Sequence, residues 1–184
     1  MHQITNACGP QIRIERENGL TETHVFATGQ EAAQRAAIVN AAFDWLGTPF
    51  VNCCDKKGPD GGVDCAMLLV RCYCDTGTLP PFDPRPYAPS WFMHQEKELF
   101  LEFLIDRLGA QEIAAPRIGD VIVWRYGKTY SHGSILINAS EILHAYGVDG
   151  SVLISRLEDD PVKYVAVKGL RFLRPVKYFS LWGA

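Results

Sequence analysis

The sequence predicts an α+β domain in which helices pack on a central antiparallel sheet. Two observations predict this fold class. Apolar residues recur at helical spacing up to about residue 108, and short apolar runs typical of strands dominate after Pro116. The length of 184 residues, an apolar fraction of 47% and a charged fraction of 21% fit one globular domain. We therefore expect a single domain over residues 1–184.

The first half of the chain is expected to be mainly helical. An alternating stretch around Asn18-Gly19 predicts a hairpin, so residues 1–28 are interpreted as an N-terminal hairpin extension. A first helix opens at Gly29-Gln30 and is stopped by Gly47-Thr48-Pro49. Two further helices are predicted over residues 64–74 and 96–108, separated by a proline-rich connector.

The second half of the chain is expected to form the sheet. Its apolar runs are short, are rich in β-branched residues and are separated by turn residues, as strands are. The predicted strands cover residues 120–124, 133–138, 141–144, 152–156 and 170–173.

Charge and hydropathy limit the partners. A net charge of −3 argues against a general binder of nucleic acid or anionic membranes, and no run approaches the roughly 18 apolar residues of a membrane span. The first residues carry no charged start followed by an apolar run, so no secretory signal is expected. We therefore expect a protein that is cytoplasmic as synthesised and that has reduced cysteines.

Cys65 is the strongest candidate for a catalytic group. It follows Gly61-Gly62-Val63-Asp64 and begins an apolar helical stretch, so its thiol lies where free N–H groups and the helix dipole favour a thiolate. Asp64 is expected to cap this helix, and amides near Cys65 can face an oxyanion. A buried structural thiol is the alternative.

Two histidines lie in predicted strands. His132 stands in Ser131-His132-Gly133 at the start of an apolar run, where a neutral imidazole can take the thiol proton and later protonate a leaving amine. His144 is the candidate for the group that orients His132, and Asn138 or Glu141 would take that role if His144 did not. A hydrogen-bonded structural histidine is the alternative for each.

No cofactor or metal is expected. Cys53-Cys54 with Cys72-x-Cys74 lacks the spacing of a zinc knuckle, and Cys72, seven residues after Cys65, is expected to pack in the core.

Several motifs together resemble the NlpC-type cell-wall peptidases. They are Trp45-Leu46-Gly47-Thr48-Pro49-Phe50, Gly61-Gly62-Val63-Asp64-Cys65, Gly119-Asp120-Val121, Ser131-His132-Gly133 and Ile142-Leu143-His144-Ala145, in the order of that family. The resemblance implies a papain-like fold, a Cys65–His132–His144 triad, and cleavage of peptide bonds in peptidoglycan stem peptides. It also implies a substrate cleft near Asp64, Ser131 and Phe50.

The motifs depart from the family at three places. Phe50 stands where a tyrosine is common, Ala66 stands where a serine is common, and the loop before Cys65 is long. The long loop, the Pro-Phe start and the segment over residues 170–175 most resemble the phage-tail and gene-transfer-agent members. Such a tail particle, or lysis, would bring the enzyme to the wall and would supply its protein partners.

Two other functions remain open at this stage. The same triad would serve an amidase, transglutaminase-like enzyme or acyltransferase that acts on another acyl group. A non-catalytic tail-assembly or wall-binding protein on an inherited fold is the non-enzymatic alternative.

Overall fold

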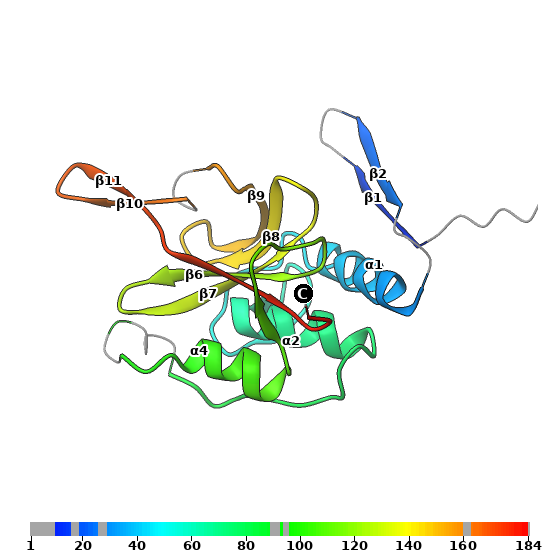
Figure 1. The fold of residues 1–184 in the computed structure, drawn as a ribbon, viewed down its shortest axis with the longest axis horizontal. Coiled ribbons are helices and arrows are strands. Elements are labelled where there is room, and N and C mark those ends of the chain that lie inside the picture. Colours follow the sequence, from blue (N-terminus) through cyan, green and yellow to red (C-terminus); the bar gives the residue numbers. More distant parts are fainter. Residues whose placement is uncertain are drawn as a thin grey trace, which may run out of the picture.

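The computed structural model describes residues 10–15, 19–25, 29–88, 93, 96–159 and 163–183. Helices and strands follow one another as an α+β fold, as predicted, with a mainly helical first half and a sheet formed later in the chain (Figure 1). The strands are β1 (Gln11–Glu15), β2 (Thr21–Val25), β3 (Asp55–Lys56), β4 (Gly62–Val63), β5 (Gln111–Ile113), β6 (Val121–Tyr126), β7 (Thr129–Leu136), β8 (Glu141–Tyr146), β9 (Ser151–Arg156), β10 (Tyr164–Val167), β11 (Leu170–Leu173) and β12 (Val176–Ser180).

A six-stranded antiparallel sheet forms the centre of the fold, in the order β5-β12-β6-β7-β8-β9. The predicted strands over residues 120–124, 133–138, 141–144 and 152–156 correspond to β6, β7, β8 and β9. Strands β5 and β12 were not predicted, because β5 is short and polar and β12 has only five residues. The predicted strand over residues 170–173 is β11, which pairs with β10 in a separate hairpin.

Two helices cover one face of this sheet. Helix α1 (Gln30–Phe43) begins after Gly29, whose φ of 140° suits glycine, and its small apolar residues pack on α2 (Cys65–Asp75). Buried residues of both helices join Ile135, Leu143 and Ala145 of the sheet in the main core. Cys72 is fully buried there, as predicted. In Figure 1, α2 and α4 lie together beneath β6 and β7.

The third predicted helix is shorter and less regular than expected. It consists of α4 (Leu99–Glu102), followed directly by the π-helical turn η1 (Phe103–Arg107). One reason for the late start is that the Glu98 carboxylate accepts a hydrogen bond from the Tyr130 N–H of β7, at 2.8 Å, and so ties the chain to the sheet before the helix begins. The π-helical turn then changes the direction of the side chains that follow it.

The predicted N-terminal hairpin is present as β1 and β2, which pair antiparallel from Gln11↔Val25 to Glu15↔Thr21. Asn18 of its turn lies outside the described residues, whereas Gly19 has a φ of 79°. Ile12 is fully buried in the main core, so this hairpin packs on the domain next to α1.

No helix in the described part of the chain is both long enough and apolar enough to span a membrane.

Candidate active site

Cys65 is the first residue of α2, and Asp64 is its N-cap. The Asp64 carboxylate accepts a hydrogen bond from the Met67 N–H at 2.9 Å, as an N-cap aspartate does. The N–H groups of Cys65 and Ala66 lie against the thiol. The first turn of α2 therefore presents two backbone donors to the sulfur and to any group bound to it.

The Asp64 carboxylate is also the centre of a small buried network. It accepts further hydrogen bonds from the Cys53 N–H, at 2.7 Å, and from the Tyr87 hydroxyl, at 2.8 Å and 2.7 Å to its two oxygens. The residue is 4% exposed. These donors compensate for burying its negative charge, and they tie the loop before α2 and the proline-rich connector to the start of the helix.

The thiol faces an unpaired edge of strand β7. Its Sγ lies 3.7 Å from the Ser131 carbonyl oxygen, which accepts its hydrogen bond, and the Gly133 N–H also points to the sulfur. This edge is free because β7 pairs with β8 only at Ile135↔Leu143 and Leu136↔Ile142. On its other side, β7 stays paired with β6 along most of its length.

Beyond the last paired residues, side chains rather than backbone connect β7 and β8. The His132 Nε2 lies 2.8 Å from the His144 Nδ1, and the His144 Nε2 lies 2.9 Å from the Ser155 Oγ on β9. Both imidazoles are buried, at 8% and 0% exposed. The contact between the two histidines uses one nitrogen of His132 and leaves its Nδ1 for another partner.

His144, and not Asn138 or Glu141, is the residue placed against His132. The Asn138 amide donates to the Glu141 carboxylate at 2.6 Å, so these two side chains bond to each other in the turn between β7 and β8. Of the three residues that the sequence offered as the neighbour of His132, the structure places His144 there.

Two tyrosines pack against the imidazoles. The Tyr126 hydroxyl donates to that of Tyr146 at 3.2 Å, and both rings lie within 5.4 Å of the His132 ring, centroid to centroid. The Tyr146 ring also stacks on His144 at 5.0 Å, with an interplanar angle of 14°. These two rings contribute to the burial of both imidazoles.

Burial in the protein makes both histidines weak bases. Burial, followed by the influence of His144 and of the Arg174 charge, holds the pKa of His132 well below its ordinary value of 6.5. Burial alone lowers the pKa of His144 to about 4. At neutral pH both rings are therefore uncharged.

The expectation that the helix start favours a thiolate at Cys65 is wrong for this structure. Burial, followed by the nearby negative charge of Asp64, raises the pKa of the Cys65 thiol to about 12. The N–H groups of Gly133, Cys65 and Ala66 act in the opposite direction but do not compensate. The resting site thus holds a neutral thiol beside a neutral imidazole.

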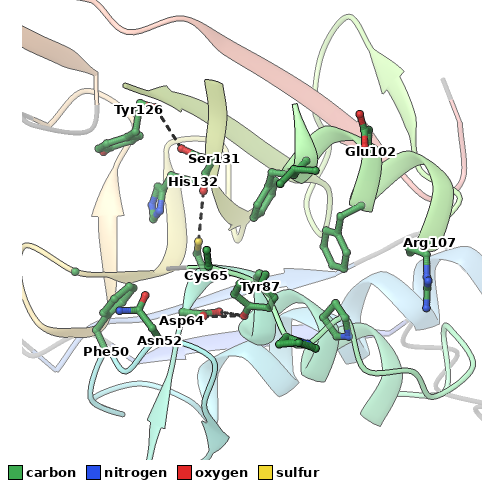
Figure 2. A pocket seen from close by; sticks show the side chains of 18 of the residues that line it. Phe50, Asn52, Asp64, Cys65, Tyr87, Glu102, Arg107, Tyr126, Ser131 and His132 are labelled. Atoms are coloured by element: carbon green, nitrogen blue, oxygen red, sulfur yellow. Dashed lines mark hydrogen bonds between the residues drawn. The ribbon is translucent and has the colours of Figure 1, made fainter. Parts of the chain in front are cut away.

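A cleft of about 810 Å³ runs over this site, and Figure 2 shows Cys65 and His132 facing it. Phe50, Asp64 and Ser131, which the motif resemblance places near the substrate, also line the cleft, whereas His144 lies behind His132. The carboxylate of Asp64 is turned to Met67, Cys53 and Tyr87, and its role in the structure is that of a cap. Asn52 and the side chains of α4 and η1 complete the walls.

The cysteines in the described part of the chain are free thiols. They are Cys53, Cys54, Cys72 and Cys74 outside the cleft and Cys65 within it. No cluster of three or more His, Cys, Asp or Glu side chains in the described ranges is arranged to hold a metal ion.

Comparison with known proteins identifies the architecture. No protein-family model matches the sequence, and neither does any curated protein. Among solved structures, NlpC1 from Trichomonas vaginalis matches with a TM-score of 0.51 and 15% sequence identity, over 92% of this chain and 54% of NlpC1. The chain has the NlpC-type fold. It spans about half the length of NlpC1.

Two mycobacterial structures match less closely. The P60 domain of an antigen from M. avium subspecies paratuberculosis has a TM-score of 0.47 and 19% identity, over 69% of this chain and 88% of that domain. The peptidoglycan hydrolase RipB from Mycobacterium tuberculosis has a TM-score of 0.43 and 18% identity, over 69% of this chain and 60% of RipB.

Within this NlpC-type fold, two groups near the reactive residues were not predicted from the sequence. Ser155 contacts His144, and the Tyr126–Tyr146 pair contacts His132. The only signal for Ser155 was a polar residue in the predicted strand over residues 152–156. Its contact with His144 depends on the register of β8 with β9, in which Ser155 is opposite Ile142, two residues before His144.

Proposed function

We propose that this protein is a cysteine hydrolase that cleaves peptide bonds in the stem peptides of bacterial peptidoglycan. One observation carries the proposal. A single cleft holds the Cys65 thiol at a helix start and the His132 imidazole, whose Nε2 bonds to His144 and whose Nδ1 remains for proton exchange. The motif resemblance to the NlpC-type peptidases supports the wall peptide as substrate, and the cleft has the size of sites that hold short ligands.

In the first chemical step, Cys65 attacks the carbonyl carbon of the scissile bond. Because the thiol and the imidazole are both neutral at rest, the thiol proton moves to the His132 Nδ1 as the sulfur–carbon bond forms. The electron pair of the carbonyl double bond moves to its oxygen. We expect the N–H groups of Cys65 and Ala66 at the start of α2, which lie against the thiol, to donate to that oxyanion.

The intermediate then collapses. The carbon–nitrogen bond breaks, the leaving amine takes the proton from the His132 imidazolium, and a thioester with Cys65 remains. Water attacks the thioester while His132 takes one of its protons. Cleavage of the carbon–sulfur bond then releases a carboxylic acid, and the proton returns to the sulfur. His144 holds the ring in position throughout, because its Nδ1 bonds to the His132 Nε2.

Digestion of purified peptidoglycan tests this function. The wild-type protein should release stem-peptide fragments, detected by mass spectrometry, and should leave the glycan strands uncut. Cys65→Ser should release none, because the serine hydroxyl is a far weaker nucleophile with this base. Cys54→Ser is the matched control, since Cys54 is a free thiol that does not line the cleft.

Other products would contradict the proposal in distinct ways. Release of reducing sugar ends would indicate a glycosidase, whose chemistry needs paired carboxylates beside the scissile bond. If no wall type yields products while a small ester or amide is turned over in a Cys65-dependent way, the enzyme is an amidase or acyltransferase.

A further inference from the structure

Ser155 contacts the ring nitrogen of His144 that His132 does not contact. It lies on β9, outside the cleft, and its Oγ is 2.9 Å from the His144 Nε2. His144 is fully buried, so each of its ring nitrogens needs a partner within the protein. His132 meets the Nδ1 and Ser155 meets the Nε2.

The chemistry of the site fixes the direction of these hydrogen bonds. The His132 Nδ1 can accept the thiol proton only if it carries none, so the ring hydrogen of neutral His132 must be on Nε2. That hydrogen is donated to the His144 Nδ1, which therefore carries none. The hydrogen of His144 is consequently on Nε2 and is donated to the Ser155 Oγ.

We propose that Ser155 is a positioning residue that accepts this last hydrogen bond and so stabilises the positive charge that His132 gains when it takes the thiol proton. This inference rests on the proposed roles of Cys65 and His132. A hydroxyl suits the task because it can accept from the imidazole while its own hydrogen turns outward, and Ser155 is half-buried. In this arrangement His132 donates to His144 and His144 donates to Ser155, so each hydrogen bond runs away from the positive charge on His132.

A mutant series on β9 tests the role without the wall substrate. Alkylation of Cys65 by iodoacetamide, followed by peptide mapping, measures the reactivity of the Cys65–His132 pair directly. In Ser155→Ala the His144 N–H lacks its serine acceptor when positive charge develops on His132. The alkylation rate of Cys65 and kcat should therefore both fall about 10-fold to 100-fold, with KM nearly unchanged. Ser155→Thr keeps the hydroxyl, suits a strand and should restore most of the rate.

Two readouts separate this role from simple loss of packing. Ser140→Ala, at an exposed serine in the turn before β8, should leave the alkylation rate and kcat unchanged. Nitrogen NMR of the imidazoles in the wild-type protein should show both His132 and His144 with hydrogen on Nε2. A hydrogen on the His144 Nδ1, or a Ser155→Ala protein that reacts at the wild-type rate, would overturn the proposal. If the substrate assignment alone is wrong, peptidoglycan release fails while the alkylation series still behaves as described.

Discussion

At the level of single residues, Cys65 and His132 form a pair of uncharged groups at rest. The thiol bonds to the Ser131 carbonyl of β7 and lies beside the Asp64 charge, and the His132 imidazole is buried against two tyrosines. Each environment opposes charge on the group that it surrounds. Proton transfer from Cys65 to His132 is therefore expected to accompany attack on the substrate and not to precede it.

This charge state leads to a prediction for Cys65. Because the thiol pKa is raised to about 12, the thiol stays protonated through neutral pH. The ultraviolet difference spectrum between wild type and Cys65→Ser should show no thiolate at neutral pH. His132→Ala removes the base that takes the proton, so the alkylation rate of Cys65 should fall by about 10²–10⁴-fold at neutral pH.

Thiolate absorbance that is already present in the wild-type protein at mildly acidic pH would contradict the neutral pair. It would show instead that Cys65 and His132 form an ion pair at rest. The unfolded protein provides the reference, because its exposed cysteines should titrate near their ordinary pKa of about 8.5.

For Cys65, the sequence predicts the position of the thiol but not its ionisation state. The position of Cys65 at a helix start is a local property, and the glycines and Asp64 before it were sufficient to predict it. The ionisation state depends on burial in the folded protein, where the thiol meets Ser131 and Gly133 of β7, more than sixty residues further along the chain. Local helix electrostatics predicted a thiolate because it could not include that burial.

At the level of elements, strand β7 connects the helices to the site, and Gly133 is the point of closest approach. A Cβ added at Gly133 would lie 2.6 Å from the Phe100 ring of α4 and 2.9 Å from a Leu69 methyl group of α2. Both neighbours are buried in the main core. The glycine after His132 is thus needed for helix packing, in addition to presenting its N–H to the thiol.

Gly133→Ala should therefore destabilise the protein by about 1–3 kcal/mol, because the added methyl group overpacks the core. Denaturant unfolding measures the change. The double variant Gly133→Ala with Phe100→Leu should recover part of the loss, since the Phe100 ring is the nearest obstacle, and this coupling identifies the cause. If the stability loss of the double variant equals the sum of the losses of the two single variants, the strain at Gly133 does not arise from Phe100.

Element boundaries were predictable where the pattern is strong and local. The apolar runs of β6 and β8 and the periodicity of α1 and α2 were sufficient, because each of these elements buries several apolar residues in a row or on one face. The third helix was predicted to begin too early, at Glu96 instead of Leu99, and the change to π-helical geometry at Phe103 leaves no mark on its apolar spacing. Strand β5 was missed because it has one buried residue, Ile113, and is held by pairing with β12.

At the level of the whole molecule, the buried histidines make stability depend on acid. Unfolded His144 binds a proton below about pH 6.5, whereas in the folded protein it resists protonation until about pH 4. The unfolded state binds more protons between these values, so the free energy of unfolding should fall as pH falls through this window. The difference corresponds to about 3 kcal/mol for His144, and His132 acts in the same direction.

Chemical denaturation at a series of pH values measures this effect. His144→Gln has no titrating ring, so it should lose about 3 kcal/mol less than the wild type between about pH 7 and about pH 4. Above about pH 7 the two proteins should depend on pH in parallel. Parallel behaviour in the acidic range as well would show that His144 is protonated as easily in the folded protein as in the unfolded chain.

The place of β12 in the sheet has a consequence for biosynthesis. Strand β12 follows both β5 and β6 in sequence but lies between them in the sheet, and β6 pairs with β7, with His132 opposite Trp124. A ribosome therefore makes Cys65 and both histidines well before it makes the strand that closes the sheet behind them. Until then β6 has a free edge and β5 has no partner strand. The growing chain should therefore carry Cys65 and both histidines before the sheet that aligns them is complete, and these groups should reach their final arrangement only after β12 has paired with β6.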